Sequence, residues 1–168
     1  MIETNRLILR PLTGEQLLKY LRNDHSLENE LGLKYTDRMI SPELREALEQ
    51  TIIPGVAGHG NNYHFSTLWT VISRAENRMV GDLCFMGEPN AEGEIEIGYG
   101  TYESERGKGY MTEAAGAMIP SAGTQPTVDV IVASTELDNP ASSAVLLKNG
   151  FVRSGQTGTL LHWRLKIR

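Results

Sequence analysis

A short basic segment with two glycines, Arg106-Gly107-Lys108-Gly109, stands directly before a stretch with helical spacing of small and apolar residues. Glycine has no Cβ atom, so the two glycines allow backbone N–H groups to converge on one point. A helix that begins at Tyr110 would add its unpaired N–H groups and its partial positive charge to the same point. The segment therefore predicts a site for an anion such as a pyrophosphate.

The spacing of this segment differs from that of the two common phosphate-binding loops. In a Walker A loop the lysine follows the second glycine, whereas here Lys108 stands between the glycines and Tyr110 follows the second. The dinucleotide fingerprint needs a third glycine, and none occupies that position. A nucleotide-binding domain of either kind is therefore disfavoured. On spacing alone, a plain turn before a helix fits equally well.

Two carboxylates form a second feature that could take part in chemistry. Glu94 and Glu96 belong to a run that alternates acidic and apolar residues up to Tyr99, which is typical of a half-buried strand. Their spacing places both carboxylates on one face, where either could accept a proton, and a solvated strand face would show the same pattern. Gly98 and Gly100 favour a bulge or the close approach of another backbone.

These residues need a scaffold, and the first part of the chain predicts one strand followed by helices. The apolar run at 6–10 predicts the strand. Thr13 occupies the first position of a capping box and so marks the start of a helix. Ser41 predicts the start of a second helix that ends at about Pro54. The glycine-rich residues 54–62 then predict a flexible loop.

The remainder of the chain predicts a mixed sheet. Short turns join three strands, at residues 68–72, 79–86 and 94–99. Two helices follow, at 110–122 and 139–149, with strands at 128–133, 151–152 and 159–167. A meander that leads into a β-α-β unit predicts an α+β fold, with a central mixed, mostly antiparallel sheet of about seven strands and helices on both faces.

Composition limits the classes of protein that remain. At about 150 residues per domain, the 168 residues predict a single domain over residues 1–168. Hydrophobic residues make up 40% and charged residues 22%, an ordinary globular composition. Cys84 is the single cysteine, so an internal disulfide and a multi-cysteine metal site are excluded. The histidines lack the spacing of metal ligands, so we expect no metal.

Charge and hydropathy bear on partners and location. The formal net charge of −5 disfavours binding to nucleic acid and suits a neutral or cationic partner. Residues 24–50 hold seven acidic and three basic side chains, which fits either a solvated helical face or a cleft wall that attracts a cation. No apolar stretch approaches the ~20 residues of a membrane helix. Because the N-terminus lacks the apolar core of a signal peptide, we expect a cytoplasmic protein.

The context of the basic segment resembles the GNAT superfamily of N-acetyltransferases. The acyl-CoA-binding loop of that superfamily follows the pattern Gln/Arg-x-x-Gly-x-Gly/Ala, and Arg106, Gly109 and Met111 occupy its three defined positions. Met111 departs from the usual small residue. Three further motifs resemble the ribosomal-protein N-terminal acetyltransferase subgroup in the same order along the chain: its first strand at 4–12, its fourth strand at 96–99 and its second CoA-contacting helix at 139–151.

The resemblance implies a GNAT-type fold and an acetyl-CoA-dependent N-acetyltransferase that acts by direct attack in a ternary complex. The acceptor would be a primary amine on a small molecule or at a peptide N-terminus. A glutamate of the fourth strand often acts as the base in this superfamily, which implies Glu96 ahead of Glu94. The residues implied to bind CoA are Tyr99, Gly100, Thr101, Arg106, Gly107, Lys108, Gly109, Tyr110, Met111, Thr112, Asn139 and Ser142.

The chemistry of the transfer agrees with this resemblance. The thioester carbonyl must be polarised, the amine must lose its proton, and the two reactants must be held together. A strand that splays away from its neighbour at residues 98–101 would offer free backbone N–H groups to the pantetheine arm and the carbonyl.

One position departs from many relatives. They carry a tyrosine that protonates the CoA thiolate where this chain has Leu146. Either another group protonates the sulfur or the thiolate leaves unassisted, which a thiol pKa near 8.5 makes tolerable. The departure keeps open an alternative of another class, a non-catalytic sensor that holds acyl-CoA without transferring the acyl group.

Overall fold

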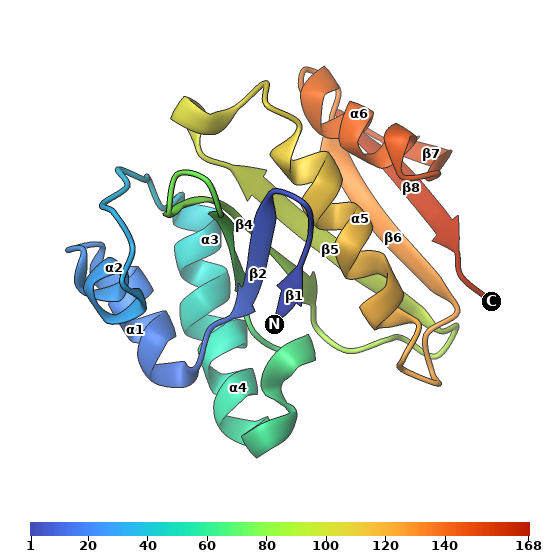
Figure 1. Ribbon diagram of the computed structural model, residues 1–168. Coiled ribbons are helices and arrows are strands. Elements are labelled where there is room, and N and C mark those ends of the chain that lie inside the picture. Colours follow the sequence, from blue (N-terminus) through green and yellow to red (C-terminus); the bar gives the residue numbers. More distant parts are fainter.

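A single mixed sheet is the centre of the molecule. The computed structural model describes residues 1–60 and 63–168 in full, and residues 61 and 62 by their backbone. In this part of the chain the strands form an eight-stranded sheet in the order β1-β2-β3-β4-β5-β6-β8-β7 (Figure 1). The strands are β1 (Ile2–Glu3), β2 (Leu7–Pro11), β3 (Trp69–Ser73), β4 (Arg78–Met86), β5 (Glu94–Thr101), β6 (Val130–Glu136), β7 (Val152–Thr157) and β8 (Leu160–Lys166).

The directions of the strands confirm the predicted α+β fold. Strands β5 and β6 run parallel, and the other neighbouring pairs run antiparallel. The sheet has one strand more than the seven expected, because Ile2 and Glu3 pair with β2. Two residues are too few to show an alternating pattern in the sequence. The closing strand expected at 151–152 is longer and runs to Thr157.

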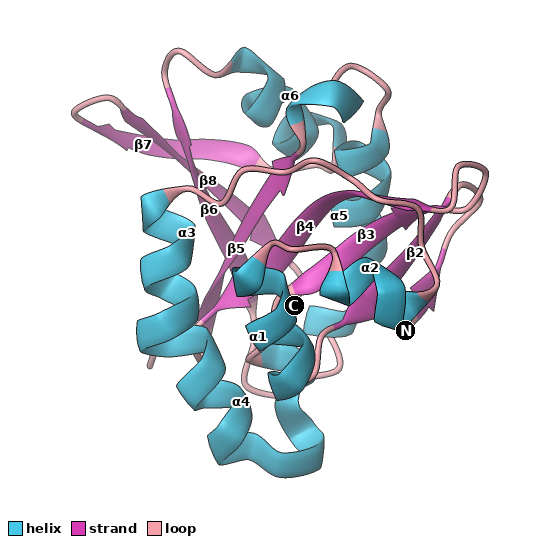
Figure 2. Cartoon of the chain, turned by 90° about the vertical axis from the view of Figure 1, so that its left-hand side faces the viewer, coloured by secondary structure: helices cyan, strands magenta, loops and turns pink.

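Helices cover both faces of the sheet, as expected. They are α1 (Gly14–Arg22), α2 (Ser26–Leu31), α3 (Pro42–Ala47), α4 (Ile53–His59), α5 (Tyr110–Ala122) and α6 (Pro140–Lys148). Figure 2 shows α1, α3 and α4 in front of the sheet, with α5 and α6 beyond it. None of the described helices is both long and apolar enough to cross a membrane.

Alternate residues of β4 face two separate cores. Leu83 and Phe85 pack with α5 and α6 in one core. Cys84 packs in the other core, with Leu17 and Tyr20 of α1. Period-two alternation therefore places every second residue of the central strands on the α1 side of the sheet, where a site between the sheet and the first helices would lie.

The first helix begins as its sequence predicts, and the second is longer than predicted. Thr13 and Gln16 form the capping box of α1. The second helix does not end at Pro54, and residues 54–62 are not a loop. A π-helical turn, η1 (Leu48–Ile52), joins α3 to α4, and a 3-10 helix, η2 (Gly60–Phe65), follows. The Ile53 N–H donates to the Leu48 carbonyl, five residues earlier, which is the hydrogen bond of a π turn. Pro54 then falls in the first turn of α4, where a residue without a backbone N–H is tolerated.

Strands β5 and β6 separate beyond a short paired stretch. Only Glu94, Ile95 and Glu96 of β5 pair with β6, although β5 continues to Thr101. Figure 1 shows the two strands diverging toward the end of the sheet where α6 begins. On the side that faces β6, the backbone of residues 97–101 therefore has no strand partner among the described residues. The structure contains the splayed strand that the two glycines favoured.

Candidate active site

A cleft of about 1510 Å³ lies on the α1 side of the sheet. One wall comes from residues 35–55, and the floor comes from β4 and β5. Asp82 is opposite Gly100, Cys84 is opposite Gly98, and Met86 is opposite Glu96 in the strand register, so these six residues share the face of the sheet under the cleft. The lining also includes Tyr99 and Thr101, so the cleft extends to the separated part of β5.

The two candidate bases differ in their surroundings. Glu96 lines the cleft, whereas Glu94 is not among the residues that line it. Glu94 accepts a hydrogen bond from Asn90 at 3.0 Å and forms an ion pair with Arg164. These contacts, the hydrogen bond from Asn90 first, lower the pKa of Glu94 and make it a weaker base. Of the two carboxylates, Glu96 is the one that can meet an amine in the cleft.

The basic segment adopts the backbone conformation that its glycines permit. Gly107 and Gly109 have φ angles of 78° and 76°, in the left-handed region that other residues rarely adopt. Helix α5 begins immediately afterwards at Tyr110, with Gly109 as its N-cap residue. The loop and the helix N-terminus therefore lie together as an anion site requires.

Lys108 makes a contact that differs from that of a phosphate-loop lysine. Its Nζ atom donates to Glu105 at 2.8 Å, and this hydrogen bond raises the pKa of Lys108. Glu105 is buried and also pairs with Arg78 at 2.5 Å. The side chain of Lys108 thus holds the loop to the element before it.

Sequence reasoning missed Arg6, which holds the same loop from the N-terminal side. Its Nη1 atom donates to the Lys108 carbonyl at 2.8 Å, and its Nε atom donates to Glu113 at 2.7 Å. The guanidinium also lies 4.9 Å from the ring centre of Tyr110. Arg6 therefore fixes both the loop and the first turn of α5. The only signal in the sequence was that Arg6, directly before β2, is basic. The loop that it contacts at Lys108 is 102 residues away in sequence.

Tyr99, Ser142 and Asn139 lie together beside the gap between β5 and β6. The Tyr99 hydroxyl donates to the Ser142 carbonyl at 2.8 Å and accepts from Ser142 Oγ at 3.1 Å. Asn139 accepts from the Ser142 N–H at 3.2 Å and caps α6. These predicted CoA residues thus connect β5 to α6 across the separated strands. Burial raises the pKa of Tyr99, so its hydroxyl stays protonated.

Two residues that depart from the family pattern both belong to the core. Met111, in the first turn of α5, is 4% exposed and packs into the core, so its side chain does not obstruct the loop. Leu146 is 1% exposed, in the core between α6 and the sheet.

A second residue missed from the sequence, Asp82, lies on the floor of the cleft and is 7% exposed. A lone aspartate inside the apolar run at 79–86 was the signal that could have found it.

A parallel strand pair separates beside a glycine loop at a helix N-terminus, which is the arrangement that the resemblance to the GNAT superfamily implies. The chain matches the family described as "Acetyltransferase (GNAT) domain" over residues 6–152. It therefore belongs to the GNAT acetyltransferases, enzymes that use acetyl-CoA, and the protein is an acetyltransferase.

Individual relatives agree with the family. The chain is 32% identical over 163 residues to Uncharacterized N-acetyltransferase YjdG of Bacillus subtilis (strain 168), covering 97% of this chain and 96% of the relative. It is 31% identical over 80 residues to Ribosomal-protein-serine acetyltransferase of Escherichia coli (strain K12), covering 48% and 45%. A solved structure, Ribosomal-protein-S5-alanine acetyltransferase from Vibrio fischeri, is similar in fold with a TM-score of 0.70 and 18% identity, covering 98% and 94%.

Proposed function

We propose that the protein transfers the acetyl group of acetyl-CoA to a primary amine by direct attack in a ternary complex, and that the acceptor is the α-amine of a peptide or protein. The observation that carries the proposal is the single cleft that joins Glu96 to the separated strand β5. The reaction needs a base and a place for a thioester side by side, and this cleft supplies both.

CoA binding follows from the backbone groups beside the cleft. The N–H groups around Gly107 and Gly109 and the N-terminus of α5 hold the pyrophosphate. The free edge of β5 at residues 97–101 pairs with the pantetheine arm and polarises the thioester carbonyl. Asn139 and Ser142 lie at the far side of the same gap and contact the arm from α6.

Glu96 takes the proton of the attacking amine, directly or through a water molecule. An α-amine has a pKa of about 7.7–8.0, against about 10.4 for a lysine side chain, so an α-amine is easier to deprotonate near neutral pH. Two of the relatives are named for action on ribosomal proteins, one at serine and one at alanine, which supports a peptide acceptor.

Release of free thiol from acetyl-CoA over a panel of amines tests the transfer and its acceptor. The panel contains peptides that begin with Ala, Ser or Met, then polyamines and aminoglycosides. We expect the highest kcat/KM with a peptide. Preference for a polyamine or an aminoglycoside over every peptide would contradict the acceptor class, as would preference for a lysine side chain in a peptide with a blocked N-terminus. Intact CoA binding with no transfer to any amine would favour the acyl-CoA sensor.

A substitution in the loop tests the CoA site. Gly109→Val places a branched side chain at a left-handed residue, within 3.4 Å of Arg6 and where a phosphate oxygen approaches. We expect CoA affinity to fall at least ~10-fold, about 1.4 kcal/mol, by calorimetry. Gly158→Val is the matched control, because Gly158 is also left-handed but has open space around it in the β7–β8 turn. Parent-like CoA binding by a folded Gly109→Val protein would refute the loop assignment.

A further inference from the structure

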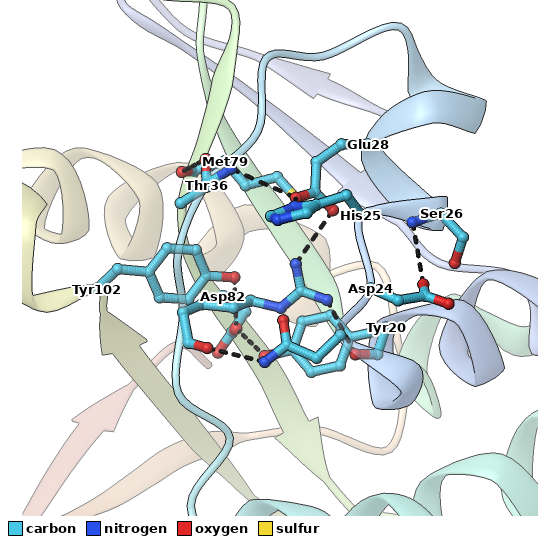
Figure 3. Close-up of polar contacts among 11 residues, drawn as sticks. Tyr20, Asp24, His25, Ser26, Glu28, Thr36, Met79, Asp82 and Tyr102 are labelled. Carbon is cyan, nitrogen blue, oxygen red and sulfur yellow. Dashed lines mark hydrogen bonds and ion pairs between the residues drawn. The ribbon is translucent and has the colours of Figure 1, made fainter.

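Asp82 is a buried carboxylate that faces the cleft with one oxygen. The hydroxyls of Tyr20 and Tyr102 both donate to its Oδ2 atom, at 2.5 Å and 3.0 Å (Figure 3). No hydrogen-bond donor among the described residues contacts Oδ1, and Oδ1 is not one of the fully enclosed atoms that lack a partner. Since Asp82 lines the cleft, Oδ1 is the oxygen that a ligand there can reach.

Burial raises the pKa of Asp82, and the nearby charge of Arg38 lowers it only in part, without forming an ion pair. Arg38 donates to Glu28 at 3.3 Å and to the Tyr20 carbonyl at 2.9 Å, and its guanidinium lies 4.3 Å from the Tyr20 ring centre. His25 lies 2.7 Å from the other oxygen of Glu28. Among the described residues no basic side chain forms an ion pair with Asp82. A buried carboxylate without an ion-pair partner is costly, so a positively charged ligand group would gain strongly there.

Asp82 and Glu96 share one floor, and the flexible side chain of Met86 covers Gly98 between them, with its sulfur 3.0 Å from where a Cβ atom of residue 98 would stand. They belong to the same face of the sheet, since Asp82 is opposite Gly100 and Glu96 is opposite Met86. Glu96 and Gly100 are four residues apart on β5, a distance of ~13 Å at about 3.3 Å per residue. Cys84 lies between the carboxylates, and burial, followed by the charges of Asp82 and Glu96, raises the pKa of its thiol. A Cβ atom at Gly100 would meet nothing within 4 Å, so the floor beside Asp82 is open.

We propose that Asp82 binds a second cationic group of the acceptor while the reacting amine lies at Glu96. This rests on the proposed function, which places the reacting amine at Glu96. An extended peptide spans about 3.3–3.6 Å per residue, so a lysine or arginine at the second or third position reaches from one carboxylate to the other. The far ammonium of a long diamine has the same chemistry, and the experiment separates the two sources.

Matched acceptors measure the contribution of the second cation. One pair is the peptide Ser-Lys-Ala-Ala and its norleucine analogue, and the other is 1,8-diaminooctane and octylamine. In the parent protein we expect kcat/KM to favour the cationic member of at least one pair by ~10-fold or more. The pair with the larger preference identifies the source of the second cation. No preference in either pair would overturn the proposal without any variant.

The substitution Asp82→Asn tests the residue itself. Asparagine keeps an oxygen that accepts from the tyrosine hydroxyls and removes the charge. The ratio of kcat/KM between the cationic acceptor and its analogue is expected to fall to within ~2-fold of unity. A general loss of activity lowers both values equally and leaves this ratio unchanged. Glu103→Gln, at the rim of the cleft, is the matched control and keeps the preference. An unchanged preference in Asp82→Asn would overturn the proposal.

Calorimetry separates failure of this proposal from failure of the proposed function. We expect the parent to bind Ser-Lys-Ala-Ala more tightly than its norleucine analogue, and Asp82→Asn to bind them equally. This difference does not require transfer, so a protein that acetylates no amine and still shows it would refute the proposed function and retain the Asp82 site. Equal binding by the parent within both pairs, the peptides and the alkylamines, would refute the site alone. If Asp82→Asn does not fold, the comparison of matched acceptors in the parent protein still tests whether a second cation is bound.

Discussion

Glu96 and Glu94 show how two carboxylates on one strand face acquire different chemistry. Glu96→Gln keeps the size of the side chain and removes its basicity. Loss of a general base costs roughly 10²–10⁴-fold in rate, so kcat is expected to fall within that range while CoA affinity persists. Steady-state kinetics and CoA calorimetry measure the two quantities. Glu94→Gln, outside the cleft, is expected to have a far smaller effect on kcat. Near-parent turnover by Glu96→Gln would transfer the role to Glu94 or to water.

Cys84 reports on the environment between the two floor carboxylates. Burial, and then the negative charges of Asp82 and Glu96, raise its pKa to about 12. Only the thiolate reacts, and an unfolded chain has a thiol pKa near 8.5, so at pH 8 iodoacetamide is expected to label the native protein ~10³-fold more slowly than the unfolded one. Mass spectrometry follows the labelling. Equal rates in the two states would mean that the floor is neither buried nor negatively charged as described.

At the scale of elements, Arg6 connects the start of β2 to the loop and to α5. Arg6→Ala removes its contacts to Lys108 and Glu113. Exposed ion pairs are each worth about 0–1 kcal/mol, so we expect the KM for acetyl-CoA to rise roughly 3–10-fold with kcat nearly unchanged. Arg74→Ala is the control, since Arg74 is a similarly exposed arginine that bonds the Thr4 carbonyl and does not contact the loop. An unchanged KM would show that the loop keeps its shape without Arg6.

Local signals predicted the elements whose ends are set by local chemistry. The capping box at Thr13 and the boundaries of α5 are confirmed. The prediction failed at Pro54, because a proline is read as the end of a helix unless a π turn precedes it. That turn depends on the packing of Leu48 and Ile52 against α1 and the sheet, and such packing is tertiary.

The site residues likewise fall into those that the sequence predicts and those that it does not. Its glycines and Glu96 follow from spacing along the chain and from the family resemblance. The roles of Arg6 and Asp82 do not, because Arg6 acts on Lys108 and Asp82 meets Tyr20 only after the sheet has formed. Contacts of this kind join residues far apart in sequence and leave no periodic pattern.

At the scale of the whole molecule, the acidic segment 24–50 turns out to serve two purposes. Glu28 and Glu30 are engaged in ion pairs with Arg38 and Lys19, so they act within the fold. Asp37 and Glu43 line the cleft. The buried ion pair of Glu28 is neither a solvated face nor a cleft wall, and attraction of a cationic acceptor by the lining residues stays a prediction.

The electrostatic field of the whole molecule predicts that the KM of the acceptor depends on salt concentration. A net charge of −5 and a cleft with acidic walls attract a cationic acceptor over distances that salt controls, since the Debye length falls from about 10 Å at 0.1 M to about 3 Å at 1 M. The KM of the acceptor identified in the panel is therefore expected to rise several-fold between these ionic strengths. Octylamine, tested beside 1,8-diaminooctane, controls for general effects of salt, because a single charge should show a smaller rise. The KM for acetyl-CoA, which is anionic, should follow its own phosphate contacts instead. A flat acceptor KM would mean that binding depends on short-range contacts at Asp82 and Glu96 alone, because pairs that are partly buried are screened far less than exposed charges.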